Sequence, residues 1–96
     1  EITEAGWQPV THVRASGGAL VERWGPGSGG ATYLTVFSER ATTTTLTLDT
    51  AALGLGTRFV ARDLLTGDQF SARAAAGGAT LSVRLSAGRV RMLRLR

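Results

Sequence analysis

Seven acidic side chains and one histidine are the residues of this chain that could act as acids or bases in catalysis. Two carboxylates can hydrolyse a glycosidic bond when one acts as an acid and the other as a base or nucleophile. Asp63 and Asp68 flank a turn, where Asp is common because it bonds to the backbone, and Glu22 is expected to be exposed or paired with an arginine. No pair lies among residues that indicate a cleft, so we predict no catalytic residue in this chain. The acidic residues are Glu1, Glu4, Glu22, Glu39, Asp49, Asp63 and Asp68.

Metal and nucleophile chemistry find no support in the sequence. His12 is the only histidine and there is no cysteine, whereas the usual zinc sites need several such ligands. No serine lies in a nucleophile-elbow context, and no glycine pair precedes a lysine or a clear helix, as a phosphate-binding loop requires. We therefore predict no metal and no cofactor, and we expect His12 at the surface.

Three aromatic residues are candidates for binding. Trp7 precedes the first expected strand, Trp24 ends a strand beside a glycine-rich loop, and Tyr33 begins the next strand. Trp24 and Tyr33 are therefore expected to meet at one end of the domain. Exposed rings of this kind can stack on sugars, but tryptophan and tyrosine are also common in partly solvated contacts between domains. Both functions stay open for these three residues.

Length and composition indicate one domain, residues 1–96. The net charge is +4 and every basic residue is arginine. The arginines are spread along the chain except for a group at its end, where charged side chains often protect an edge strand. We therefore predict no nucleic-acid partner. No apolar run approaches the roughly 20 residues of a membrane span, so we predict no membrane partner either.

The chain begins with Glu1 and shows no signal-peptide pattern. We expect it to be a piece of a larger protein whose targeting signal lies outside it, so the sequence leaves the localisation open. The absence of cysteine is compatible with a secreted protein.

Strand signals recur at spacings near ten residues, which is typical of an all-β protein, a sandwich or barrel. We predict an antiparallel two-sheet β-sandwich of about eight strands. Glycine turns at Ser16–Gly18 and Ser86–Arg89 each predict a hairpin between the strands that flank them. The expected strands cover residues 9–15, 19–25, 31–39, 42–48, 58–65, 69–75, 79–85 and 90–96.

Local patterns predict further details. Asp49 can cap a single helical turn that Gly54 and Gly56 end, and Gly67 occupies the left-handed position of a turn. In residues 42–48 the leucines are expected to face inwards and the threonines outwards. In the last strand apolar residues occupy both faces. Either the strand is covered by other elements on both sides or a bulge at Met92–Leu93 changes its register, and we favour the bulge.

Several segments together resemble the C-terminal β-sandwich domains of modular bacterial glycoside hydrolases. The segments are Val21-Glu22-Arg23-Trp24-Gly25, Tyr33-Leu34-Thr35-Val36-Phe37, Leu46-Thr47-Leu48, Ala52-Leu53-Gly54-Leu55, Asp63-Leu64-Leu65-Thr66-Gly67 and the closing Leu-x-Val-x-Leu segment. The resemblance implies a domain that packs on a separate catalytic barrel and has no catalytic residue of its own. It names no sugar.

The sequence therefore predicts a non-catalytic accessory domain, the C-terminal fragment of a glycoside hydrolase, which stabilises the catalytic domain of the same parent chain. One alternative is a carbohydrate-binding module that binds polysaccharide through Trp7, Trp24 and Tyr33. Another is an immunoglobulin-like interaction or adhesion domain.

Overall fold

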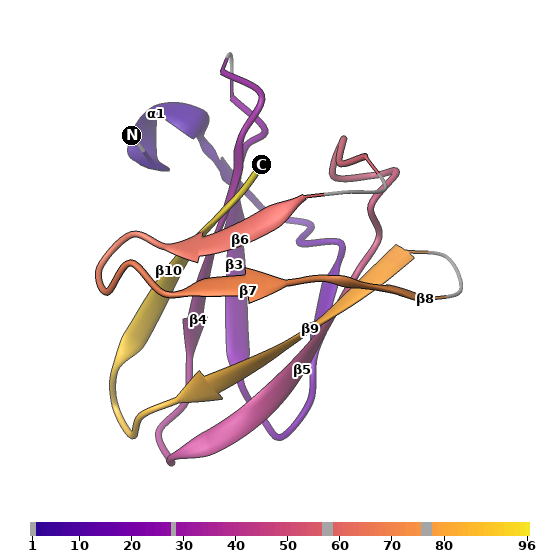
Figure 1. The fold of residues 1–96 in the computed structure, drawn as a ribbon. Coiled ribbons are helices and arrows are strands. Elements are labelled where there is room, and N and C mark those ends of the chain that lie inside the picture. The colour runs from indigo at the N-terminus through magenta and orange to yellow at the C-terminus, as the bar shows by residue number, and fades with distance from the viewer. Residues whose placement is uncertain (1, 28, 57–58, 76–77) are drawn as a thin grey trace.

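The computed structural model describes residues 2–27, 29–56, 59–75 and 78–96. Within them ten strands form two antiparallel sheets, preceded by the short helix α1 (Ile2–Ala5) (Figure 1). The predicted antiparallel β-sandwich is confirmed. The structure has two strands more than the eight expected. The short β1 precedes the first predicted strand, and the segment 69–75 divides into two strands. None of the described helices is long and apolar enough to cross a membrane.

The larger sheet has six strands in the order β1-β3-β4-β10-β6-β7. The long strands β4 and β10 lie at its centre and pair over six consecutive positions, from Val90 opposite Phe37 to Leu95 opposite Thr32. The strands are β1 (Trp7–Gln8), β3 (Leu20–Trp24), β4 (Thr32–Phe37), β6 (Val60–Asp63), β7 (Gln69–Ser71) and β10 (Val90–Leu95).

The smaller sheet has four strands in the order β2-β5-β9-β8. Seven consecutive pairs join β5 to β9, from Thr42 opposite Leu85 to Leu48 opposite Ala79. The strands are β2 (Val13–Ala15), β5 (Thr42–Leu48), β8 (Arg73–Ala75) and β9 (Gly78–Leu85).

The core lies between the two sheets. Side chains alternate across a strand, so every second residue faces the opposite sheet. In β9 the buried positions are apolar and the exposed ones are Ser82 and Arg84. The core contains Val13, Leu34, Val36, Leu46, Leu48, Leu53, Phe59, Ala61, Ala79, Leu81, Val83, Leu85, Leu93 and Leu95.

Both predicted glycine-turn hairpins are wrong. The turn at Ser16–Gly18 leads from β2 in the smaller sheet to β3 in the larger sheet, and Ser86–Arg89 leads from β9 to β10 in the opposite sheet. Each turn bonds to a neighbouring segment: Thr45 N donates to Ser16 Oγ over 2.9 Å, and Gly88 N donates to Ser38 O over 2.9 Å. When a turn leads from one sheet to the other, the apolar sides of both strands still face the same core. Alternating apolar residues and a glycine turn are therefore as compatible with such a crossing as with a hairpin.

The segment 69–75 also changes sheet. Its first part, β7, pairs with β6, and its second part, β8, pairs with β9. By contrast, the predicted turn with Gly67 in the left-handed position is confirmed, since Gly67 has a φ of 82° and the strands on either side of the turn, β6 and β7, pair directly. The capped turn after β5 is confirmed as well, because Ala52 N donates to Asp49 Oδ1 over 3.1 Å.

Two details of the predicted strands are wrong. The pairing of β10 with β4 is continuous, so there is no bulge at Met92–Leu93 in this ladder. Leu93 is fully buried, whereas Val90 on the other side of the strand is 41% exposed. Thr44 faces inwards and is fully buried because its hydroxyl donates to the carbonyl oxygen of Ser16 over 2.8 Å.

Candidate functional site

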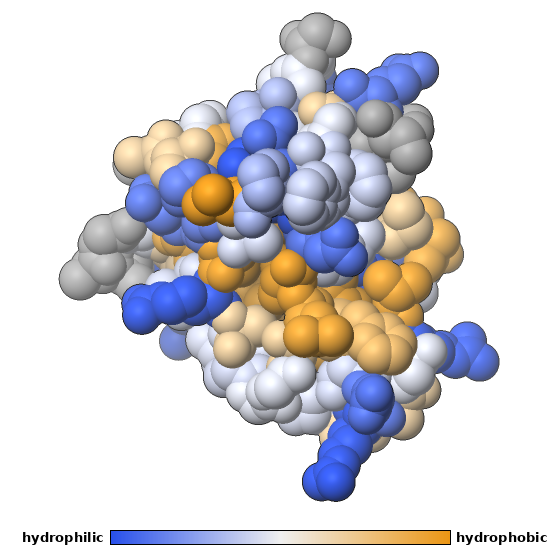
Figure 2. All heavy atoms as spheres, turned by 180° about the vertical axis from the view of Figure 1, so that it is seen from behind, coloured by the Kyte–Doolittle hydropathy of each residue, from blue (hydrophilic) through white to orange (hydrophobic). Residues whose placement is uncertain are grey.

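The outward side of the larger sheet carries exposed apolar side chains from β3, β4 and β10. Leu20 lies opposite Phe37, which lies opposite Val90, and Met92 comes two residues later on the same side. Leu20 is 67% and Val90 41% exposed, while Phe37 and Met92 are half-buried. We call Leu20, Phe37, Val90 and Met92 the apolar face. Figure 2, seen from behind Figure 1, shows apolar side chains gathered across the middle of the molecule with charged ones around them.

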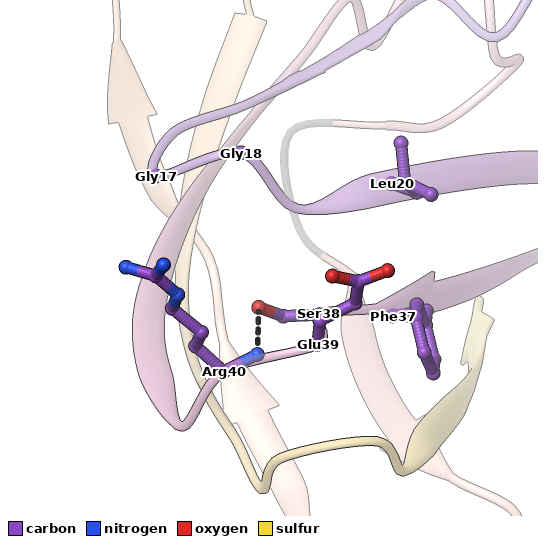
Figure 3. A pocket seen from close by; sticks show the side chains of 7 residues that line it. All are labelled: Gly17, Gly18, Leu20, Phe37, Ser38, Glu39 and Arg40. Atoms are coloured by element: carbon purple, nitrogen blue, oxygen red, sulfur yellow. Dashed lines mark hydrogen bonds between the residues drawn. The ribbon is translucent and has the colours of Figure 1, made fainter.

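A hollow of about 400 Å³ lies at one end of the apolar face, beside Leu20 and Phe37. Figure 3 shows the Glu39 carboxylate close to these two side chains, while Arg40 extends towards the turn at Gly17. The loop is held by a bond from Arg40 N to Ser38 Oγ of 3.2 Å. The hollow therefore combines an apolar wall with one carboxylate and one guanidinium.

The three predicted aromatic residues lie in one row across β1, β3 and β4. Trp7 is opposite Trp24, and Trp24 is opposite Tyr33. Trp7 is 52% exposed and its Nε1 donates to Glu22 Oε2 over 2.7 Å. Trp24 is half-buried, and its Nε1 is buried without a hydrogen-bond partner among the described residues. Tyr33 is only 6% exposed, so it presents no ring face to a sugar.

The N-terminal segment helps to cover this row. Helix α1 contacts β3 and β4, and Tyr33 lines a hollow together with Glu4 and Ala5. One end of the larger sheet's outward side is thus covered by the chain itself, while Leu20 and Val90 at the other end remain open.

The outward side of the smaller sheet differs in composition. Its strands present hydroxyl groups, such as those of Thr45 and Ser82, together with arginines. No carboxylate belongs to the outward positions of the described strands of this sheet. We call this side the polar face; it contains Arg14, Thr43, Thr45, Thr47, Arg73, Thr80, Ser82 and Arg84.

Asp63 supports the structure of a turn. Its side chain is 1% exposed, and its Oδ1 accepts bonds from the backbone N–H groups of Leu65 (2.8 Å) and Thr66 (3.3 Å). Its Oδ2 lies 2.9 Å from Arg91 Nη1, which also lies 3.1 Å from Asp68 Oδ2. Both oxygens are engaged and the side chain is buried, so Asp63 holds the turn in place.

Arg91 links this turn to the other sheet. Its guanidinium lies 5.1 Å from the centre of the Phe70 ring, and its Nε donates to Arg84 O on β9 over 2.8 Å. Burial alone would lower the pKa of Arg91, but the hydrogen bonds and attraction from Asp68 and Asp63 outweigh it and raise that pKa. We call Asp63, Asp68, Phe70 and Arg91 the Asp63 corner.

Sequence reasoning missed the buried Arg23. Its side chain shares the inward side of β3 with Val21, and its Nε and Nη2 donate to Val10 O over 3.0 and 2.7 Å. Nη1 donates to Gly25 O. Burial lowers its pKa. The alternation of side chains along a strand could have indicated this, because it places Arg23 on the same inward side as Val21.

Of the possible catalytic groups, Asp63 and Asp68 come together, and both pair with the Arg91 guanidinium. Glu22 lies on the outward side of the larger sheet opposite Thr35, whereas Asp63 lies on the inward side opposite Leu93. His12 is exposed, as expected. Among the described residues no three His, Cys, Asp or Glu side chains gather as metal ligands. In this arrangement Asp63 and Asp68 stabilise a turn through Arg91.

The two antiparallel sheets with their shared core define a β-sandwich domain. The chain belongs to the family of α-galactosidase C-terminal β-sandwich domains, whose model matches residues 18–95. Comparison with curated proteins and with solved structures found no match. The predicted resemblance to C-terminal β-sandwich domains of glycoside hydrolases is confirmed.

Proposed function

We propose that this chain is the C-terminal domain of a larger glycoside hydrolase, an α-galactosidase, and that it packs through its apolar face on the catalytic barrel of the same parent chain. Its role is to stabilise the barrel, while catalysis belongs to the barrel. The observation that carries the proposal is the apolar face, which lies open on a domain of a family that is named after the C-terminal part of α-galactosidases.

Burial of the apolar face gives a physical reason for packing. Contiguous exposed apolar area is typical of contact surfaces, and its burial contributes roughly 25 cal/mol for each Å² removed from water. Leu20 and Val90 lie on either side of Phe37 in one row. Three neighbouring strands thus present one continuous apolar surface, on which a rigid partner domain can pack.

The hollow beside Leu20 and Phe37 can receive an anchoring side chain from the barrel. Central side chains in well-packed pockets contribute most of the energy of many interfaces. Glu39 and Arg40 line the hollow, so they can pair with charged groups at the rim of the contact.

The stacking alternative has less support from the structure. Of its three candidate rings only Trp7 is largely exposed, and Tyr33 is buried. We therefore favour a contact between domains for this row as well.

The test compares the catalytic domain alone with the same domain joined to this chain. We expect the joined protein to unfold at a higher temperature and the 96-residue chain alone to hydrolyse no α-galactoside above background. Equal unfolding temperatures would contradict the stabilising role. Hydrolysis by the chain alone that is lost on Glu22→Gln or Asp63→Asn would contradict the absence of catalysis.

A further inference from the structure

A polar groove lies where the chain passes from β7 in the larger sheet to β8 in the smaller one. It has a volume of about 460 Å³, which is in the range of small-molecule sites. Five neutral hydrogen-bonding side chains line it, and no hydrogen bond among the described residues uses their side-chain groups. They are Thr45, Gln69, Ser71, Thr80 and Ser82.

Phe70 adds an apolar surface to this groove. Its ring is half-buried and is held by the Arg91 guanidinium, 5.1 Å from the ring centre. Arg91 is in turn fixed by Asp63 and Asp68. The groove thus has one positioned ring among hydroxyl and amide groups, a combination that suits a ligand with both C–H faces and many hydroxyls, namely a saccharide.

Arg73 is the one charged side chain that lines the groove, and it forms no ion pair within the described residues. It belongs to the polar face, whose outward positions on the described strands include two more arginines, Arg14 and Arg84, and no carboxylate. Positive side chains with no carboxylate among them attract ligands of negative charge, and a planar guanidinium matches a carboxylate with two parallel hydrogen bonds.

We propose that this groove binds an acidic saccharide, with Arg73 pairing with a uronic-acid carboxylate and the hydroxyl and amide groups bonding to the sugar hydroxyls. The site lies away from the apolar face, so binding and packing on a catalytic domain can occur together. The proposal does not depend on the function proposed above.

The test is calorimetric titration of the 96-residue chain with α-1,4-linked tri-galacturonate and, separately, with the neutral tri-galactose of the same linkage. We expect the acidic trisaccharide to bind more tightly. Arg73→Gln should weaken its binding about tenfold, as expected for loss of one charged hydrogen-bond pair, and Ser82→Val should also weaken it. Unchanged melting temperatures confirm that the variants fold.

Arg14→Gln is the matched control. Arg14 and Arg73 end one row across the smaller sheet, through Thr47 and Thr80, so their strands lie three spacings or about 14 Å apart. The control should bind like the original chain. The proposal is overturned by absence of binding, by equal binding of the neutral trisaccharide, or by equal weakening in both arginine variants, which would indicate unspecific attraction.

Discussion

The Asp63 corner and the apolar face share strand β10, but the side chains of the corner have their partners within the chain and those of the apolar face are partly open to solvent. At the corner, Arg91 reaches Asp63, Asp68, the Phe70 ring and the backbone of Arg84. On the apolar face, the neighbouring Val90 remains 41% exposed.

This difference separates structural residues from residues available for contact. A buried charge is tolerated when its partners lie within the chain, and at Asp63 they do. The apolar face has no such partners among the described residues, so its stabilisation depends on another surface. Substitutions should therefore weaken the chain alone at the corner and leave it almost unchanged on the apolar face.

The largest effect is expected for Asp63→Ala. It removes a buried carboxylate from Arg91 and from the turn, which should lower the free energy of unfolding by about 3–5 kcal/mol. Urea denaturation of the chain measures this. Asp68→Ala is the control, since Asp68 is the exposed partner of the same arginine and should cost no more than about 1 kcal/mol. An equal loss of stability in both variants would show that the buried and the exposed partner of Arg91 contribute alike, which contradicts this prediction.

The next effect is expected for Arg23→Met. The variant keeps an apolar side chain of similar length but loses the bonds to the carbonyl groups of Val10 and Gly25. We expect a loss of about 1–3 kcal/mol and faster proteolysis before residue 13. Unchanged stability and cleavage would show that Arg23 does not hold the N-terminal segment.

A smaller effect is expected for Trp24→Phe. The change removes some apolar area, but it also removes the buried N–H that has no partner among the described residues, and an unpaired buried donor costs about 1–3 kcal/mol. The two terms offset each other, so stability should change by less than about 1 kcal/mol. A larger loss by thermal denaturation would indicate that Nε1 has a partner.

The smallest effect is expected for Leu20→Thr combined with Val90→Thr. Threonine suits a strand, and exposed substitutions usually change stability by less than about 0.5 kcal/mol. Urea denaturation of the chain measures this. The core change Leu81→Ala, expected to cost about 2–5 kcal/mol, is the reference. A comparable loss in the double variant would place the apolar face in the core.

The sequence predicted what depends on neighbouring residues. Alternation predicted most of the strands, Asp49 predicted the capped turn, and Gly67 predicted a left-handed turn. It did not predict which sheet each strand joins, because the same alternation and the same glycine turns serve a hairpin and a crossing between sheets.

The sequence also could not predict contacts between distant residues. Asp63 looked like an ordinary turn residue because its partner, Arg91, is 28 positions away. The apolar face depends on the register of β3, β4 and β10, which brings Leu20, Phe37 and Val90 into one row.

The most direct test of the central claim uses the absence of cysteine from this chain. Leu20→Cys places a thiol on the apolar face, and Thr43→Cys places one on the polar face, where both positions are exposed. The rate of thiol labelling at each site is measured by mass spectrometry in the chain alone and in the chain joined to its catalytic domain. We predict that joining slows labelling at Leu20→Cys and leaves Thr43→Cys unchanged. Unchanged labelling at Leu20→Cys, or slower labelling at Thr43→Cys alone, would contradict packing through the apolar face.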